Sequence, residues 1–308
     1  MLNNKQIFYS NGKLLLSGEY AVLDGATAFA LPIKFGQTLE FKNNISDNIF
    51  KWEAFVKEKL WFFVDFDLAN FNIINTNIKP VAERLQNILI TLNKLKPEFK
   101  SEIQNNVISN INFNREWGFG TSSTLINNIA NWAKINPFSL FKNISEGSGY
   151  DIAAAQISKP FLYTVSDITN PIIKEIDFTP NFTDKLDFVY LGKKQNSDKS
   201  IAEYKKTEKF NNMEINEISL ISKSMAKCNN IVNFQKLMIQ HENIIGSILK
   251  IKPIKKSQFS NFEGSIKSLG AWGGDFIMVA SNNDNNYVRK YFAKKNLNTI
   301  FTYNQLKI

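Results

Sequence analysis

Residues 106 to 134 read NVISNINFNREWGFGTSSTLINNIANWAK. Alternating apolar positions in the first eight residues predict a strand, and Thr121-Ser-Ser123 supplies the hydroxyl groups favoured where a helix begins. We expect that helix to run to about Lys134. Between strand and helix, Gly118 and Gly120 allow a tight turn and a close approach to a ligand. Such a turn could be a phosphate-binding loop or an ordinary capped helix, and this segment alone does not separate the two.

Two further glycine segments carry acidic residues. Gly147-Ser-Gly-Tyr-Asp151 precedes an alanine-rich helix, where the aspartate could accept a proton from a substrate hydroxyl. Capping of that helix is the commoner use of an aspartate, and for this segment alone it is the better supported interpretation. Gly270-Ala-Trp-Gly-Gly-Asp275 predicts a turn before a strand that reaches Val279.

The remaining elements alternate between strands and helices. We expect two short strands around a glycine turn in 14–23, strands or a packed connection in 48–71, and a helix after Pro80. Strands are also expected at 161–165 and 186–191. The last third predicts amphipathic helices over 218–232 and 234–248, a helix at 287–295 and a closing strand. This mixed order favours an α+β fold over a doubly wound sheet, with a domain boundary near residue 184.

Composition bounds the class of protein. The 308 residues are 44% hydrophobic, which suffices for two ordinary domains or one large one. No apolar run is long enough for a membrane helix, and the N-terminus lacks the pattern of a secretory signal. The single cysteine, Cys228, fits a reduced, cytoplasmic protein. The net charge of +9 comes from dispersed lysines, so we expect no nucleic acid or membrane partner, but a bias towards anionic substrates.

Several familiar sites are missing from the sequence. It contains neither a Gly-x-x-x-x-Gly-Lys-Ser/Thr loop nor a Gly-x-Gly-x-x-Gly fingerprint. His241 is the only histidine and lies on an apolar helical stripe, which predicts a core or domain-contact residue. A site with several histidines, or with a cluster of thiolates around zinc, is therefore excluded.

Four segments, in order, resemble motifs of the GHMP kinases. Asn11-Gly-Lys-Leu-Leu-Leu-Ser-Gly-Glu-Tyr-Ala-Val-Leu23 resembles the first motif in its mevalonate and phosphomevalonate kinase form. Gly118-Phe-Gly-Thr-Ser-Ser123 resembles the phosphate-binding motif Gly-Leu-Gly-Ser-Ser-Ala. Gly147–Ala153 resembles the segment with the catalytic aspartate and contains the Gly-Tyr-Asp-Ile-Ala string of a GYDIA-type subgroup. Gly270–Asp275 resembles the third motif, Gly-Ala-Gly-Gly-Gly-Asp.

The resemblance implies a two-domain GHMP kinase fold. An N-terminal ATP-binding domain (1–184) like ribosomal protein S5 domain 2 would be followed by a ferredoxin-like domain (185–308). ATP and Mg²⁺ would meet a small acceptor between the domains. The expected acceptor is phosphomevalonate or mevalonate, in isoprenoid precursor synthesis, and the expected state is a monomer or homodimer.

The resemblance also implies roles for single residues. Asp151 matches the catalytic base and Lys13 the lysine that supports it and the transferring phosphoryl group. The phosphate loop would comprise Gly118, Phe119, Gly120, Thr121, Ser122 and Ser123, with the Ser122 hydroxyl reaching Mg²⁺. The residues expected to bind the substrate are Glu19, Lys193, Ser197, Gly273, Gly274 and Asp275. Of these, Glu19 is expected chiefly to position other groups.

Three positions depart from the family pattern. Asn11 replaces the proline before the first motif, and Trp272 replaces a glycine, which would bring a bulky ring near the site. Leu140 stands where mevalonate kinases carry a magnesium-binding glutamate, with Glu146 as a nearby substitute. Because of these departures, the alternative hypothesis stays open that the protein has the GHMP fold but is catalytically silent and binds a nucleotide or a partner. Mevalonate diphosphate decarboxylase is a weaker alternative, because its first motif differs.

Overall fold

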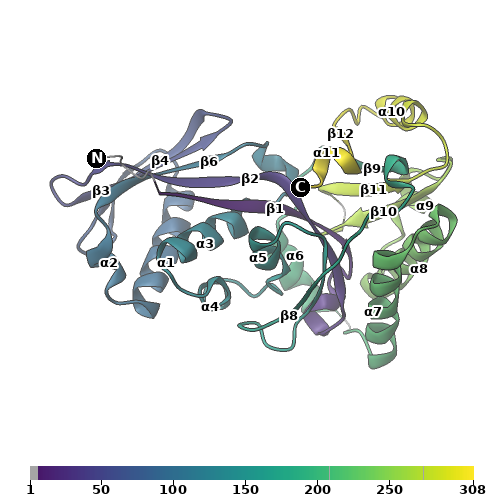
Figure 1. Ribbon diagram of the computed structural model, residues 1–308, viewed down its shortest axis with the longest axis horizontal. Helices are drawn as coiled ribbons and strands as arrows, with labels where there is room; N and C mark the ends of the chain where they lie inside the picture. Colours follow the sequence, from purple (N-terminus) through teal and green to yellow (C-terminus); the bar gives the residue numbers. More distant parts are fainter. Residues whose placement is uncertain (1–5, 208, 273) are drawn as a thin grey trace.

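The computed structural model describes residues 6–207, 209–272 and 274–308. These residues form two β-sheets, one in each half of an elongated molecule, with helices packed against both (Figure 1). The two-sheet architecture agrees with the α+β fold expected from the sequence.

The larger sheet belongs to the N-terminal half. In its described residues it has eight strands, ordered β5-β4-β3-β6-β2-β7-β8, with β1 paired to β2. The β3–β6 pair is parallel, and the other pairs are antiparallel. The bounds of its strands are β1 Ile7–Ser17, β2 Ala28–Asn44, β3 Ile49–Val56, β4 Lys59–Asp67, β5 Ile73–Thr76, β6 Asn105–Ile111, β7 Phe161–Thr164 and β8 Ile172–Glu175.

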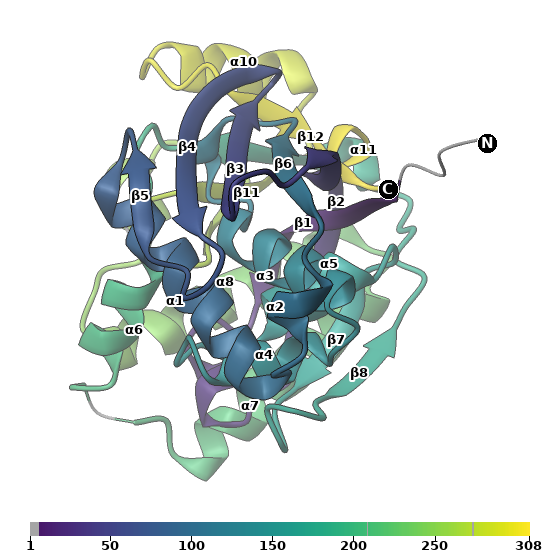
Figure 2. The same cartoon turned by 90° about the vertical axis from the view of Figure 1, so that its left-hand side faces the viewer.

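One face of this sheet is covered by helices, as Figure 2 shows. They are α1 Lys79–Leu95, α2 Phe99–Glu102, α3 Thr121–Trp132, α4 Pro137–Lys142 and α5 Tyr150–Gln156. On α1, Leu85, Ile88, Leu89 and Leu92 recur at helical spacing and are all buried in the core between helices and sheet. The helix predicted after Pro80 is therefore confirmed.

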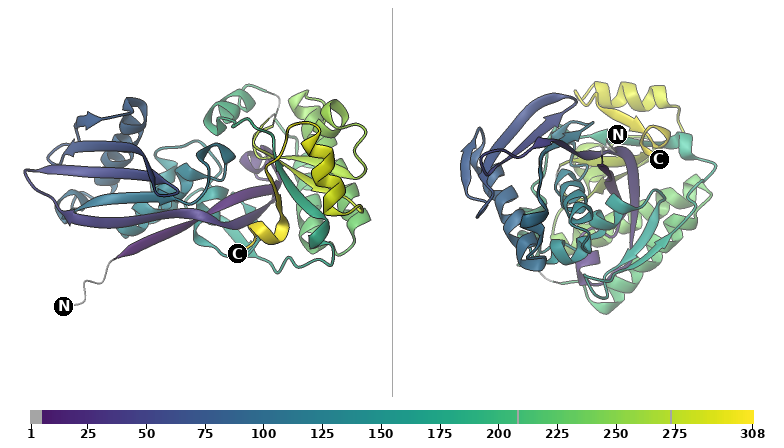
Figure 3. Two further views of the ribbon diagram at one scale, coloured as in Figure 1. Left: turned by 90° about the horizontal axis from the view of Figure 1, so that it is seen from above. Right: turned by 60° about the vertical axis from the view of Figure 1, so that its left-hand side comes forward.

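The long β1–β2 pair joins the two halves (Figure 3). Successive side chains of a strand point to opposite faces of the sheet. Leu15 accordingly enters the core under the N-terminal helices, while its neighbours Leu14 and Leu16 enter the core shared with the C-terminal half. One strand thus contributes to the hydrophobic cores on both sides.

The smaller sheet is antiparallel, with the order β10-β11-β9-β12. Its strands are β9 Leu186–Tyr190, β10 Ser265–Leu269, β11 Phe276–Ala280 and β12 Ile300–Thr302. One face packs on α9 Ile254–Gln258 and α10 Asn285–Ala293. The other face shares a core with β1, β2, α7 Asn212–Lys227 and α8 Ile231–Leu249. The two short helices α6 Ser197–Tyr204 and α11 Tyr303–Leu306 complete this half.

Two local predictions are wrong. The strand expected after Gly18 is instead the 3₁₀ helix η1, Ala21–Asp24, which ends at Gly25 with a φ of +95°. Val232 belongs to α8 rather than to the helix before it, because Cys228 ends α7 and Asn230 caps α8 through the amide of Asn233.

The boundary at residue 184 stays a prediction. It lies between the last strand of the large sheet and the first strand of the small one, β9. Across the residues that the structure describes, the helices are all too short or too polar to cross a bilayer.

Candidate active site

A cavity of about 520 Å³ lies where the two halves meet. Its walls come from the C-terminal part of β1, the start of α3, the start of α5, the segment around α6 and the turn before β11. The lining residues used below are Lys13, Glu19, Tyr20, Arg84, Gly118, Gly120, Thr121, Ser122, Ser123, Tyr150, Asp151, Lys194, Gln195, Ser197, Asp198 and Asp275.

The predicted phosphate loop forms one wall of this cavity. Gly118 and Gly120 have φ values of +65° and +90°, which glycine adopts without strain. Gly120 is the N-cap of α3, and Thr121 and Ser122 follow in the first helical turn. The amides of a first turn have no partner within the helix and, with the helix dipole, favour an anion. The loop thus has the backbone geometry and the free amides that favour an anion.

Phe119 contributes only its main chain to the loop. Its carbonyl accepts a hydrogen bond from the Lys13 amide at 3.1 Å. Its ring is fully buried and stacks on Phe276 and Phe35, with centroids 4.9 and 5.7 Å away. The ring lies in the core shared by the two halves and does not line the cavity, so the prediction that Phe119 binds the cofactor applies at most to its backbone.

The two predicted catalytic side chains face the same cavity. Lys13 Nζ donates to the Gly118 carbonyl at 3.1 Å and lies 5.6 Å from the centre of the Tyr150 ring. Burial alone would lower the pKa of Lys13, but neighbouring Tyr150, Asp275 and Asp151 raise that pKa above its usual value. Lys13 is therefore positively charged at neutral pH.

Asp151 lies in the first turn of α5, as expected from the sequence. Its carboxylate accepts hydrogen bonds from the Ser123 hydroxyl and, at 3.0 Å, from the amide of Ile152. Ser123 thus belongs to the phosphate loop and also orients the carboxylate. The N-cap of α5 is Gly149 and no side chain caps this helix, so the capping interpretation of Asp151 is wrong, and Asp151 lines the cavity from within the first turn.

Asp275 brings a second carboxylate to the phosphate loop. Its Oδ1 accepts the amide of Gln195 at 3.0 Å, and burial raises the pKa of the carboxyl group. The carboxylate touches Gly118 closely, because a Cβ atom on that glycine would lie 2.6 Å from the Asp275 Cγ. Asp275 has a φ of +52°. Gly274 packs against the Lys193 carbonyl and does not line the cavity, and Gly273 lies outside the described residues.

Lys193 does not reach the main cavity, contrary to its expected role. The Asp275 amide donates to the Lys193 carbonyl at 2.7 Å, and the Lys193 side chain lines a smaller hollow with Phe259. This pairing fixes the backbone so that the next residue, Lys194, lines the cavity and donates to the Arg115 carbonyl at 2.8 Å. Ser197 lines the cavity as predicted.

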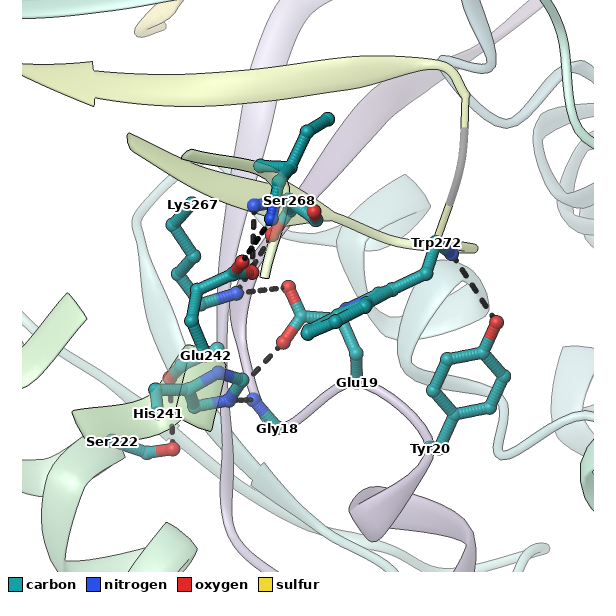
Figure 4. Close-up of polar contacts among 11 residues, drawn as sticks. Gly18, Glu19, Tyr20, Ser222, His241, Glu242, Lys267, Ser268 and Trp272 are labelled. Carbon is teal, nitrogen blue, oxygen red and sulfur yellow. Dashed lines mark hydrogen bonds and ion pairs between the residues drawn. The ribbon is translucent and has the colours of Figure 1, made fainter. Parts of the chain in front are cut away.

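Glu19 lies at the base of the cavity, within a buried polar cluster (Figure 4). Its carboxylate accepts a hydrogen bond from the ammonium group of Lys267, and its Oε2 lies 3.2 Å from Nε2 of His241. Burial lowers the pKa of His241 well below its usual range, and the neutral ring accepts the Gly18 amide at 2.8 Å. His241 is a domain-contact residue, as expected. The Oε1 atom of Glu19 is bound to Lys267, whereas Oε2 has no hydrogen-bond partner among the described residues, and the expected place of Glu19 on the substrate side stays a prediction.

Trp272 does not line the cavity, contrary to expectation. Its ring is 8% exposed and belongs to a small apolar cluster with Tyr204, Phe210 and Ile245. Its amide donates to the Tyr20 hydroxyl at 3.2 Å, as Figure 4 shows. The bulky residue thus fills a hydrophobic gap between the halves and leaves the cavity open.

The oxygen atoms around the loop are of the chemical type that binds a magnesium ion. Ser122 supplies a hydroxyl, and Asp151 and Asp275 supply carboxylates in the same cavity; Mg²⁺ prefers such ligands together with substrate phosphates. Leu140 is buried in the N-terminal core. Glu146 is exposed, pairs with Lys205 at 2.5 Å and does not line the cavity. Neither position provides the missing glutamate.

Sequence reasoning missed several residues of the cavity wall, among them Tyr20, Arg84, Tyr150 and Lys194. Tyr150 lies inside a recognised motif, so its position next to Asp151 was a usable signal. Tyr20 belongs to the first motif in the same way. Arg84 and Lys194 lie outside all four motifs, and no periodicity distinguishes them from surface cations.

Among known proteins, only solved structures were found to be similar to this chain. No protein-family model matches the chain, and no curated protein sequence matches it. The solved structures include mevalonate kinase from Methanococcus jannaschii, at 17% identity and a TM-score of 0.68, covering 98% of each chain. Phosphomevalonate kinase from Streptococcus pneumoniae, in complex with phosphomevalonate and AMPPNP, has 14% identity and a TM-score of 0.69, covering 96% of this chain and 99% of that one.

A third similar structure is a sugar kinase. Galactokinase from Lactococcus lactis, complexed with galactose, has 11% identity and a TM-score of 0.65, covering 99% of this chain and 94% of that one. Identities this low support conclusions about fold. The chain has the two-domain fold of the GHMP kinases over nearly its whole length.

Proposed function

We propose that the protein is an ATP-dependent kinase of the GHMP type that phosphorylates a small molecule. The observation that carries this proposal is the convergence of three features on one cavity. They are the glycine loop at the start of α3, the charged amine of Lys13 and the carboxylate of Asp151. A phosphoryl-transfer site needs each of them, to hold the donor, neutralise charge and accept a proton.

In the proposed reaction the acceptor oxygen attacks the γ-phosphorus of ATP. The bond from that phosphorus to the bridging oxygen breaks and ADP leaves. A hydroxyl acceptor, as in mevalonate, passes its proton to Asp151, whereas a phosphate acceptor, as in phosphomevalonate, is already ionised and needs only to be oriented. Ser123 and the Ile152 amide hold the Asp151 carboxylate in place. Lys13 offsets the negative charge of the transferring group, and Gly118 fixes its amine through the 3.1 Å hydrogen bond.

Magnesium would be held by the Ser122 hydroxyl and by a carboxylate of Asp151 or Asp275. It would neutralise phosphate charge during transfer. Glu146, the substitute considered from the sequence, lies outside the cavity, so the Asp275 side chain, placed against Gly118, is the candidate for the second carboxylate.

Phosphomevalonate is the first candidate acceptor and mevalonate the second. The motifs that resemble those kinases support this order, and the two kinases are also among the similar structures. The catalytically silent alternative has lost one of its two supports, because Trp272 is packed outside the cavity. The other support, the missing glutamate at Leu140, stands.

The decisive experiment measures ADP release from ATP with magnesium against phosphomevalonate, mevalonate, homoserine and simple sugars. Asp151→Asn and Asp151→Ala are assayed beside Asp177→Asn, which alters an exposed aspartate paired with Lys159. We expect turnover that depends on one acceptor, a fall of about 10² to 10⁴ in kcat in both Asp151 variants, and no change in the control.

Other outcomes separate the alternatives. ATP binding without turnover on any acceptor would favour the silent binding protein. Turnover that survives in the Asp151 variants would refute the assigned base while leaving a kinase in place.

A further inference from the structure

Arg84 is a cation at the mouth of the cavity that no family motif contains. It lies on α1, and its side chain is 57% exposed. Its Nη2 atom donates to the Ser122 hydroxyl at 3.1 Å and lies 3.4 Å from Oδ2 of Asp198, at the start of α6. Arg84 therefore links the phosphate loop of the N-terminal half to a helix of the C-terminal half.

Three cationic side chains line the described part of the cavity, and their contacts differ. The amines of Lys13 and Lys194 donate to the main-chain carbonyls of Gly118 and Arg115. The contacts of Arg84 with Ser122 and Asp198 both go through Nη2, whereas a guanidinium group has five N–H donors in a planar fork. The guanidinium thus has donors to offer an incoming ligand.

The position of these donors indicates the ligand. Ser122 lies in the first turn of α3, where backbone amides and the helix dipole favour an anion. A guanidinium group hydrogen-bonded to that serine lies next to any phosphate that occupies the turn. Guanidinium also matches phosphate geometry through paired hydrogen bonds.

We propose that Arg84 binds the nucleotide phosphates, and that Asp198 competes with those phosphates for the guanidinium group. This inference rests on the proposed nucleotide site. Asp198 is exposed and lies 3.4 Å from Arg84 Nη2, and because it carries the same sign of charge as phosphate, the two compete for the guanidinium group. A phosphate that binds Arg84 displaces Asp198 from the guanidinium group. Occupancy of the loop is thereby coupled to the contact between α6 and Arg84 on α1.

The test measures dissociation constants for ATP and for adenosine, which lacks phosphates, at low ionic strength. The variants are Arg84→Gln, Arg84→Lys, Asp198→Asn and the double variant Arg84→Gln/Asp198→Asn. Lys79→Gln, on the same helix but outside the cavity, controls for the loss of one charge.

We expect Arg84→Gln to weaken ATP binding about 10- to 100-fold with little effect on adenosine. Arg84→Lys should keep part of the affinity, and Lys79→Gln should keep all of it. Asp198→Asn should tighten ATP binding several-fold, because the competing carboxylate is gone. The double variant should match Arg84→Gln, since without the guanidinium group there is nothing left for Asp198 to restrain.

Two results would overturn the inference. One is an ATP affinity of Arg84→Gln within twofold of the wild type. The other is an Asp198→Asn effect that persists in the double variant, which would show that the carboxylate acts without Arg84. Failure of the proposed nucleotide site looks different, because the unmodified protein would then bind no ATP, whereas failure of the catalytic proposal alone would leave ATP binding without turnover.

Discussion

Glu19 and Lys267 form a buried ion pair although they are 248 positions apart in the chain. Glu19 follows the end of β1, whereas Lys267 lies on β10, so the pair joins the N-terminal and C-terminal halves at the base of the cavity. The Lys267 amine also donates to the Ser268 carbonyl at 2.8 Å. Burial raises the pKa of Glu19 even though Lys267 acts to lower it.

Lys267→Met should destabilise the protein by about 3 to 5 kcal/mol. The substitution leaves the Glu19 carboxyl group buried without its partner, which is the costly way to break such a pair. Chemical denaturation at pH 7 measures the free energy of unfolding. Adding Glu19→Gln to Lys267→Met should recover part of the loss, because no ionisable group is then stranded.

An exposed pair provides the control for this prediction. Lys159 and Asp177 lie 2.9 Å apart on the surface, so Lys159→Met should change stability little. An equal loss in the two lysine variants would contradict the assigned importance of the buried pair.

Trp272→Gly restores the residue of the family motif, and we expect it to harm the protein. The ring fills the apolar cluster beside Tyr204, so its removal should cost about 3 to 5 kcal/mol of stability. Thermal unfolding and steady-state kinetics on the folded fraction provide the measurements. A rise in kcat without loss of stability would mean that the ring obstructs the cavity after all.

Gly118→Ala should impair nucleotide binding more than its backbone strain explains. Its added Cβ would lie 2.6 Å from the Asp275 carboxylate carbon, inside the phosphate loop. Gly25→Ala is the matched control, because Gly25 also has a positive φ, +95°, but has nothing within 4 Å of the added atom. Both variants should lose about 1 kcal/mol of stability from the strained backbone.

The ATP dissociation constant then separates the two glycines. It should rise for Gly118→Ala and stay unchanged for Gly25→Ala. Equal ATP affinities in these two variants would show that the contact with Asp275 is unimportant for the loop.

Asp187 should make the protein less stable as the pH rises from about 4 to 6. Its side chain on β9 is 1% exposed, and neither carboxylate oxygen has a hydrogen-bond partner among the described residues. Burial raises the pKa of this group to about 6, despite an opposing effect of Arg289. Because the folded state holds the proton more tightly than the unfolded chain, stability present at low pH is lost as the pH increases.

Asp187→Asn should remove this part of the pH dependence. Denaturant melts at pH 4 and pH 7.5 give the change in unfolding free energy for both proteins, and we expect a difference of about 2 to 3 kcal/mol between them. Identical pH profiles would show that the carboxyl group titrates normally.

Local patterns were sufficient for most elements and for the chemistry of the loop. The glycines at 118 and 120, followed by hydroxyl residues, predicted the loop and α3, because backbone freedom and helix capping act over a few neighbouring residues. The apolar spacing after Pro80 predicted α1 for the same reason. Motif order added the expectation that Lys13 and Asp151 belong to one site.

Tertiary structure decided which side chains reach that site. Trp272 and Lys193 were expected near it and do not line it, whereas Arg84 and Lys194 line the cavity without any motif. These outcomes depend on contacts between segments far apart in sequence, such as the hydrogen bond from the Asp275 amide to Lys193 and the one from Arg84 on α1 to Ser122 on α3. A local pattern fixes backbone conformation over a few residues, but the direction of a side chain in a loop is set by the partners that folding brings to it.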